Sequence, residues 1–116
     1  MHHLYTYRCY PQRVIDGDTV RLTINLGMNI QVVENVRLRG INAPEIRGPE
    51  RPEGLKSKDF LEWLLDEPNF PDHSYYCTTY KDRKGKYGRY IVELFVDENC
   101  INDIMVEEGY AEPYVE

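Results

Sequence analysis

The sequence has little cysteine, a single tryptophan and no long hydrophobic run. The three cysteines, Cys9, Cys77 and Cys100, are widely spaced and form no CxxC pair, so their spacing indicates neither a disulfide framework nor a zinc site. We expect buried or half-buried free thiols. No apolar stretch reaches the ~20 residues that a membrane span needs. The first ten residues lack the basic and apolar regions of a signal peptide.

Basic residues are absent from positions 97–116, which contain seven acids. The net charge of the chain is −6, which argues against a generally basic nucleic-acid binder. The first 96 residues nevertheless carry a net charge of +1, and five basic residues lie between Lys81 and Arg89. An anion site near that segment therefore fits the charge pattern, and the acidic segment would point elsewhere.

The length of 116 residues, 41% of them hydrophobic and 29% charged, predicts one globular domain over residues 1–116. Alternation and turn residues predict strands over 4–15, 19–25, 30–38, 74–80 and 89–96, the first with an edge or bulge at Pro11 and the third with a break at Glu34–Asn35. Residues 40–54 are expected to form a loop. Helices are predicted over 55–67 and 101–108, the second with a cap at Gly109.

The first predicted helix presents apolar side chains at helical spacing, and we expect all of them in the core: Phe60, Leu61, Trp63, Leu64 and Leu65. Five strands with a helix between the third and the fourth and a short C-terminal helix can curl into a small closed barrel. The predicted fold class is therefore mainly β, an OB-type barrel with two helices.

Three short segments carry the side chains that chemistry would need. The segment Asp16-Gly17-Asp18-Thr19 places two carboxylates in a tight turn, where they are ordinary turn residues or ligands for a hard cation. In Arg37-Leu38-Arg39-Gly40-Ile41-Asn42-Ala43-Pro44-Glu45, strand parity turns Arg37 away from the Val36 and Leu38 side. A solvated arginine and a solvated loop acid are the ordinary explanation of this segment when it is taken alone.

The third segment, Lys84-Gly85-Lys86-Tyr87-Gly88-Arg89, is either a solubilising hairpin turn or a loop that wraps a phosphate and stacks Tyr87 on a base. Taken together, the three segments supply what phosphodiester hydrolysis requires. Carboxylates can hold a metal ion, arginines can bind phosphate oxygens, and a further carboxylate can accept a proton from water.

The combination resembles the staphylococcal nuclease (thermonuclease) family. The resemblance rests on VIDGDTVRL at 14–22, VRLRGINAPE at 36–45, KYGRYIVELF at 86–95 and INDIMVEEGYA at 101–111. It implies a five-stranded OB barrel and a Ca²⁺-dependent phosphodiesterase that cuts DNA and RNA at the bond to the 5′-oxygen and leaves 3′-phosphate ends.

The resemblance also implies a role for each matching position. Asp18 matches a calcium carboxylate, Asn42 stands where the family usually has a second calcium aspartate, and Ala43 matches the residue that lends a backbone carbonyl. Arg37 and Arg89 match the two phosphate-binding arginines, and Glu45 matches the general base. Lys86 and Tyr87 match positions that contact the terminal phosphate and the base. Single-stranded DNA or RNA is the expected substrate, and the expected state is a monomer.

Two of the departures from the family concern the site. Asn42 keeps an oxygen but removes one negative charge, which Asp16 or a water would compensate. The family's base-stacking tyrosines near the C-terminus have only nearby candidates here, Tyr110 and Tyr114.

These departures leave a second function open, an OB-fold module that binds nucleic acid or protein with little or no turnover. A third hypothesis is that the acidic segment, residues 97–116, is a docking surface for another protein. Free thiols favour the cytoplasm, whereas members of the family are often secreted, so the sequence leaves both locations open.

Overall fold

A computed structural model describes residues 4–66, 72–81 and 90–115. Five strands form a closed barrel: β1 (Thr6–Asp16), β2 (Thr19–Gly27), β3 (Ile30–Leu38), β5 (Tyr75–Lys81) and β6 (Tyr90–Val96). Neighbours pair antiparallel in the order β3-β2-β1-β5-β6, and a parallel pairing of β3 with β6 closes the circle. The predicted OB-type barrel is confirmed.

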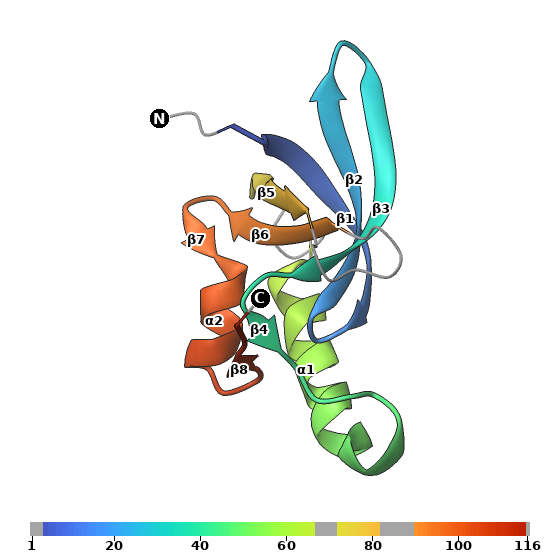
Figure 1. The fold of residues 1–116 in the computed structure, drawn as a ribbon, viewed down its shortest axis with the longest axis vertical. Helices are drawn as coiled ribbons and strands as arrows, with labels where there is room; N and C mark the ends of the chain where they lie inside the picture. The colour runs from blue at the N-terminus through green and yellow to red at the C-terminus, as the bar shows by residue number, and fades with distance from the viewer. Residues whose placement is uncertain (1–3, 67–71, 82–89, 116) are drawn as a thin grey trace.

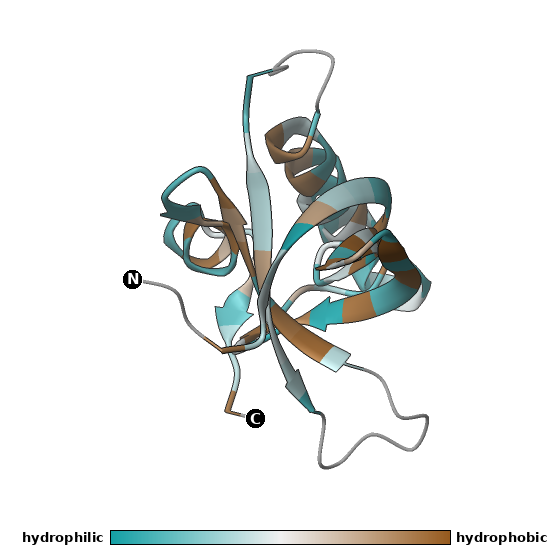
Figure 2. Cartoon of the chain, turned by 90° about the horizontal axis from the view of Figure 1, so that it is seen from above, coloured by the Kyte–Doolittle hydropathy of each residue, from teal (hydrophilic) through white to brown (hydrophobic). Residues whose placement is uncertain are grey.

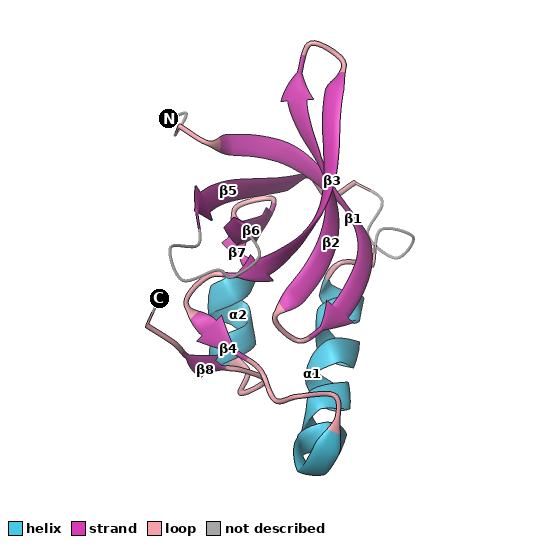
Figure 3. Ribbon diagram, turned by 45° about the vertical axis from the view of Figure 1, so that its right-hand side comes forward, coloured by secondary structure: helices cyan, strands magenta, loops and turns pink. Residues whose placement is uncertain are grey.

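Shorter elements complete the chain: β4 (Ile41–Asn42), the 3₁₀ turn η1 (Gly48–Glu50), α1 (Arg51–Leu64), β7 (Asn99–Cys100), α2 (Ile101–Glu107) and β8 (Glu112–Pro113). Both helices lie at one end of the barrel, and the β2–β3 hairpin projects from the opposite end (Figures 1 and 3). The pairing of β4 with β8 brings the C-terminal segment back to the end of β3. No helix in the described part of the chain is long and apolar enough to cross a membrane.

The barrel core follows the alternation of the strands. Val20, Leu22 and Ile24 of β2 are buried, in keeping with the alternation that predicts a strand over 19–25, and Figure 2 shows hydrophobic stretches where the strands cross at the centre. Cys9 and Cys77 are buried free thiols inside this core, and Cys100 is half-buried and free, which confirms the prediction for the cysteines.

Strand β1 carries the predicted irregularity at proline. Its pairing register with β2 shifts between Pro11 and Arg13, so a bulge accommodates the missing backbone N–H. The predicted break in β3 is wrong, because Glu34 and Asn35 pair without interruption with Leu22 and Arg21.

Helix α1 differs from the prediction at its start. It begins at Arg51 instead of Leu55, so the last residues of the predicted loop are helical. Pro52 suits the first turn of a helix, where its backbone N–H would have no partner. The helix ends at Leu64, with Leu65 as its C-cap, so it stops before the predicted end at Glu67.

The predicted core face of α1 is correct except at one position. Leu61 and Leu65 are buried and Phe60 and Leu64 pack against the core, but Trp63 is 55% exposed. The four-residue spacing placed Trp63 at the edge of the stripe, where the helix turns it toward solvent. Helix α2 ends at Glu107, one residue before the predicted end, and Gly109 lies in the left-handed region at φ +80°, as the predicted cap requires.

Candidate active site

Asp18 lies in the two-residue turn between β1 and β2 and connects this turn to two other parts of the chain. Its carboxylate Oδ2 accepts a hydrogen bond from the backbone N–H of Ala43 at 3.0 Å, and its carbonyl accepts one from the N–H of Leu38 at 2.7 Å. Its other carboxylate oxygen, Oδ1, accepts from the Thr19 hydroxyl at 3.1 Å. These contacts hold the turn against the ends of β3 and β4.

Close backbone packing explains the glycine of this turn. A Cβ at Gly17 would lie 2.7 Å from the Cβ atoms of both Ala43 and Ser57, closer than real Cβ contacts allow. Gly17 is therefore required by the approach of the turn to β4 and α1. The Asp18 carboxylate reaches the Ala43 N–H because no side chain intervenes.

The charge state of Asp18 is set by its surroundings. Burial raises the pKa of Asp18 to about 6, and the neighbouring Asp16 carboxylate contributes further to the increase. The hydrogen bonds from Ala43 and Thr19 act in the opposite direction. A cation bound nearby would therefore stabilise the ionised form of this carboxylate.

Arg37 reaches the same corner from the end of β3. The pairing of Thr19 with Arg37 places this arginine beside the Asp18 turn, and flanking residues Val36 and Leu38 are fully buried, which confirms that Arg37 faces outward. Its Nη2 donates to the carbonyl of Ile41 at 2.8 Å. The fork of the guanidinium is thus oriented by the residue that precedes Asn42.

The ring of Tyr114 supports the same guanidinium. Arg37 Cζ lies 4.8 Å from the centroid of that ring, a cation–π contact. The N–H of Tyr114 donates to the Gly40 carbonyl at 2.8 Å, which extends the β4–β8 pairing. The sequence marked Tyr114 only as a nearby aromatic, because nothing in its spacing indicates that β8 returns to β4.

Tyr110, the other C-terminal candidate for base stacking, has a packing role. Its ring stacks on Phe60 of α1 with centroids 4.2 Å apart, and its carbonyl accepts a hydrogen bond from the Ser57 hydroxyl at 2.6 Å. These contacts fix the segment after α2 against α1.

Glu45 is solvent-exposed in the loop after β4, and its backbone is fixed by α1. A Cβ at Gly54 would lie 2.0 Å from the Glu45 carbonyl oxygen, so the loop contacts the helix where only glycine leaves room. The sequence assigns Gly54 to the predicted loop, so the contact of this residue with Glu45 was missed. A glycine within the first turns of the helix is the one sequence signal of that contact.

Asn42 and Ala43 bring the oxygen atoms that the resemblance assigns to the ion. Asn42 is exposed on β4 and pairs with Glu112 of β8, and a hollow of about 160 Å³ opens beside both residues. Within the described residues, no three His, Cys, Asp or Glu side chains gather as a metal site. The donors here are one or two carboxylates with amide and carbonyl oxygens, which suit a hard cation such as Ca²⁺.

The structure therefore brings Asp18, Ala43 and Arg37 together and places Asn42 and the Glu45 loop next to them. Three predicted site residues, Lys86, Tyr87 and Arg89, lie outside the described residues.

Comparison with known proteins agrees with the fold. The profile described as staphylococcal nuclease homologue matches residues 35–116, which is more than half of the chain. An uncharacterized protein of Methanocaldococcus jannaschii, MJ1439, is 27% identical over 89% of this chain and 57% of that protein. The SPbeta prophage-derived endonuclease YokF of Bacillus subtilis is 28% identical over 85% of this chain and 31% of that protein.

The chain thus spans about half of one relative and a third of the other. The barrel, the position of its helices and the profile match lead to one conclusion: the chain belongs to the staphylococcal nuclease homologue family.

Proposed function

We propose that the protein is a Ca²⁺-dependent phosphodiesterase that acts as a monomer, prefers single-stranded DNA or RNA and leaves 3′-phosphate ends. The observation that carries the proposal is the convergence of Asp18 with Arg37 and Ala43, which lie much later in the sequence, at one corner of the barrel. The family membership and a relative named as an endonuclease support a nuclease.

The donor chemistry fits a calcium ion held by the Asp18 carboxylate, the Asn42 amide oxygen and the Ala43 carbonyl, with Asp16 nearby. A bound Ca²⁺ would supply charge neutralisation at the phosphate. Arg37 binds phosphoryl oxygens through its planar fork and stabilises the charge that grows on them in the transition state. Arg89 is the proposed second arginine.

Glu45 is the proposed base. Its carboxylate takes a proton from the attacking water, whose oxygen bonds to phosphorus while the bond from phosphorus to the 5′-oxygen breaks. The departing 5′-oxygen takes up a proton from solvent and Glu45 returns its proton to solvent, which leaves a 5′-hydroxyl, a 3′-phosphate and a regenerated carboxylate. Lys86 and Tyr87 are the proposed contacts to the terminal phosphate and base of the substrate.

Cleavage of labelled single-stranded DNA tests this proposal, with Ca²⁺ and then with EDTA. We expect fragments that EDTA abolishes, and we expect Glu45→Gln and Arg37→Ala to lower the rate by orders of magnitude while circular dichroism shows an intact fold. The assignment fails if both variants cut as fast as the parent at matched Ca²⁺.

Asn42 favours a second candidate, a binding module with little or no turnover, because a neutral amide replaces a charged ligand. That function predicts a gel shift of the same DNA without fragments in either Ca²⁺ or EDTA.

A further inference from the structure

The outer face of strands β1, β2 and β3 has a composition unlike the rest of the molecule. The buried residues of these strands point into the barrel, so the alternate positions of the paired strands point outward. Nine side chains form this surface, which we call the arginine face: Arg8, Tyr10 and Arg13 of β1, Arg21, Thr23 and Asn25 of β2, and Gln31, Val33 and Asn35 of β3.

The nine side chains of the arginine face include three arginines and no acid, although the chain as a whole carries −6. Arg13 also lines a hollow with Glu62 and Asp66, so the positive charge of this face comes chiefly from Arg8 and Arg21. Glu34 is the acid of β3, and it pairs with the buried Leu22 and therefore belongs to the opposite face. A local excess of positive charge of this kind attracts a polyanion even when the net charge of the protein is negative.

The side chains of the arginine face are arranged for contact with nucleic acid. Arg21 Nη1 donates to Asn35 Oδ1 at 3.1 Å, and Arg8 Cζ lies 5.7 Å from the centroid of the Tyr76 ring, so two of the arginines are held in place. Tyr10 is 38% exposed and offers a ring for base stacking. The amides of Asn25 and Gln31 can hydrogen-bond to phosphates or base edges.

The arginine face runs directly into the candidate active site. The pairing of Arg21 with Asn35 is followed along the two strands by the pairing of Thr19 with Arg37. Asn35 and Arg37 are alternate residues of one strand, about 7 Å apart on the same face. A chain of phosphates on this surface therefore has a continuous path to the arginine that would bind the scissile phosphate.

We propose that the arginine face is the track that holds the part of a single-stranded nucleic acid beyond the scissile nucleotide. The inference rests on the proposed function for the identity of its ligand. It assigns the three arginines to phosphates and Tyr10 to an unpaired base, which is why a single strand fits better than a duplex.

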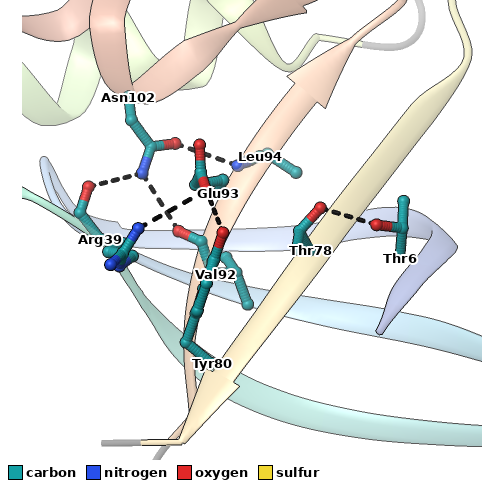
Figure 4. Close-up of polar contacts among 8 residues, drawn as sticks. All are labelled: Thr6, Arg39, Thr78, Tyr80, Val92, Glu93, Leu94 and Asn102. Carbon is teal, nitrogen blue, oxygen red and sulfur yellow. Dashed lines mark hydrogen bonds and ion pairs between the residues drawn. The ribbon is translucent and has the colours of Figure 1, made fainter. Parts of the chain in front are cut away.

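The surface on the other side of Arg37, around Arg39, is unfavourable for a polyanion. Arg39 lies there beside a hollow of about 590 Å³, but its guanidinium stacks on Tyr80 and its Nη1 is 3.8 Å from Glu93 Oε1 (Figure 4). Asp103 and Glu107 line the same hollow. Three acids around one paired arginine would repel phosphates, so the substrate track is assigned to β1, β2 and β3.

Salt dependence of binding measures the phosphate contacts. The probe is a fluorescein-labelled oligothymidylate of about 12 nucleotides, titrated in EDTA so that it is not cleaved. Each single variant should reduce the slope of log K against log salt by about 0.7, and the triple variant should reduce it by about 2. The single variants are Arg8→Gln, Arg13→Gln and Arg21→Gln. Lys56→Gln is the matched control, because it removes one charge from an exposed position on α1.

The track is overturned if the slopes of the arginine variants equal that of the parent, or if Lys56→Gln lowers the slope as much as Arg21→Gln. Circular dichroism of each exposed-site variant verifies that the barrel is intact. The glutamine side chain keeps hydrogen-bonding capacity, so a change in slope reports the lost charge.

Cleavage in Ca²⁺ separates this inference from the proposed function. The triple variant should raise KM for the long oligonucleotide several-fold and leave KM for a dinucleotide unchanged, because a dinucleotide does not reach the arginine face. Binding with an arginine-dependent slope but without cleavage would overturn the proposed function and keep the track. Cleavage of both substrates with unchanged KM values would overturn the track and keep the proposed function.

Discussion

Gly54 in the first turns of α1 contacts the backbone of Glu45 so closely that a Cβ would lie 2.0 Å from the Glu45 carbonyl oxygen. Backbone atoms cannot move aside as the end of a flexible side chain can. The helix therefore acts as a fixed support for the loop that carries the proposed base.

Gly54→Ala tests this support. The added methyl group must displace the Glu45 loop or α1, so we expect a loss of about 1–3 kcal/mol in the free energy of unfolding, measured in urea. Alanine favours a helix more than glycine does, so intrinsic propensity predicts the opposite sign. An unchanged or increased stability would show that the Glu45 loop moves aside at no energetic cost and is not fixed by α1. Lys56→Ala, exposed on the same helix, is the control and should be nearly neutral.

The sequence predicted those features that depend on local pattern. Alternation in Val20, Leu22 and Ile24 identified the inward face of β2, and the same parity showed that Arg37 points outward. Pro11 predicted its bulge because a missing N–H has a local consequence.

Features that depend on tertiary contact were missed or misplaced. The start of α1 was hidden because Pro52 and Gly54 are loop signals, and the reason for Gly54 is its contact with a distant carbonyl. Trp63 has a spacing consistent with the core but faces solvent.

The candidate site could be assembled only by resemblance. Nothing local indicates that Ala43 donates to Asp18, because the two are 25 positions apart. The position of Tyr114 on Arg37 depends on the return of β8 to β4, which two-residue strands do not reveal in a sequence.

Tyr114→Ala should lower the rate of cleavage by roughly fivefold, which corresponds to about 1 kcal/mol, because the ring that supports the Arg37 guanidinium is lost. Tyr114→Phe keeps an aromatic face and should retain most of the activity. Single-turnover rates on saturating single-stranded DNA measure the effect on chemistry. Equal losses in the two variants would assign the role to the hydroxyl group and contradict the cation–π contact as its source.

Asn42→Asp should tighten Ca²⁺ binding by roughly tenfold, because it adds a carboxylate to a donor set with low charge. Isothermal titration calorimetry measures the affinity without any need for turnover. The same substitution should lower stability in EDTA, since the new carboxylate would lie opposite Glu112 and next to the residue that binds Asp18, without a cation. Unchanged or weaker Ca²⁺ binding would exclude Asn42 as a ligand position.

Asp18→Asn should stabilise the metal-free protein at neutral pH. Burial raises the pKa of Asp18 to about 6, above its ordinary value of 3.8, so the folded state binds the proton more tightly than the unfolded state. The stabilising contribution of the protonated carboxyl is complete below pH 3.8 and is lost as the pH rises through about 6. The variant has no such titration, so its stability relative to the parent should increase over this range by at most about 3 kcal/mol.

Urea unfolding in EDTA at a series of pH values measures this difference for Asp18→Asn. Asp16→Asn is the control, because removing the neighbouring carboxylate lowers the pKa of Asp18 and should move the loss of stability to lower pH. Parallel pH profiles for the parent and Asp18→Asn would contradict the raised pKa. Added Ca²⁺ should stabilise the parent more than Asp18→Asn at pH 7, because only the parent offers an ionised Asp18 carboxylate to the ion. This difference in stabilisation would connect the titration of Asp18 to the proposed metal dependence.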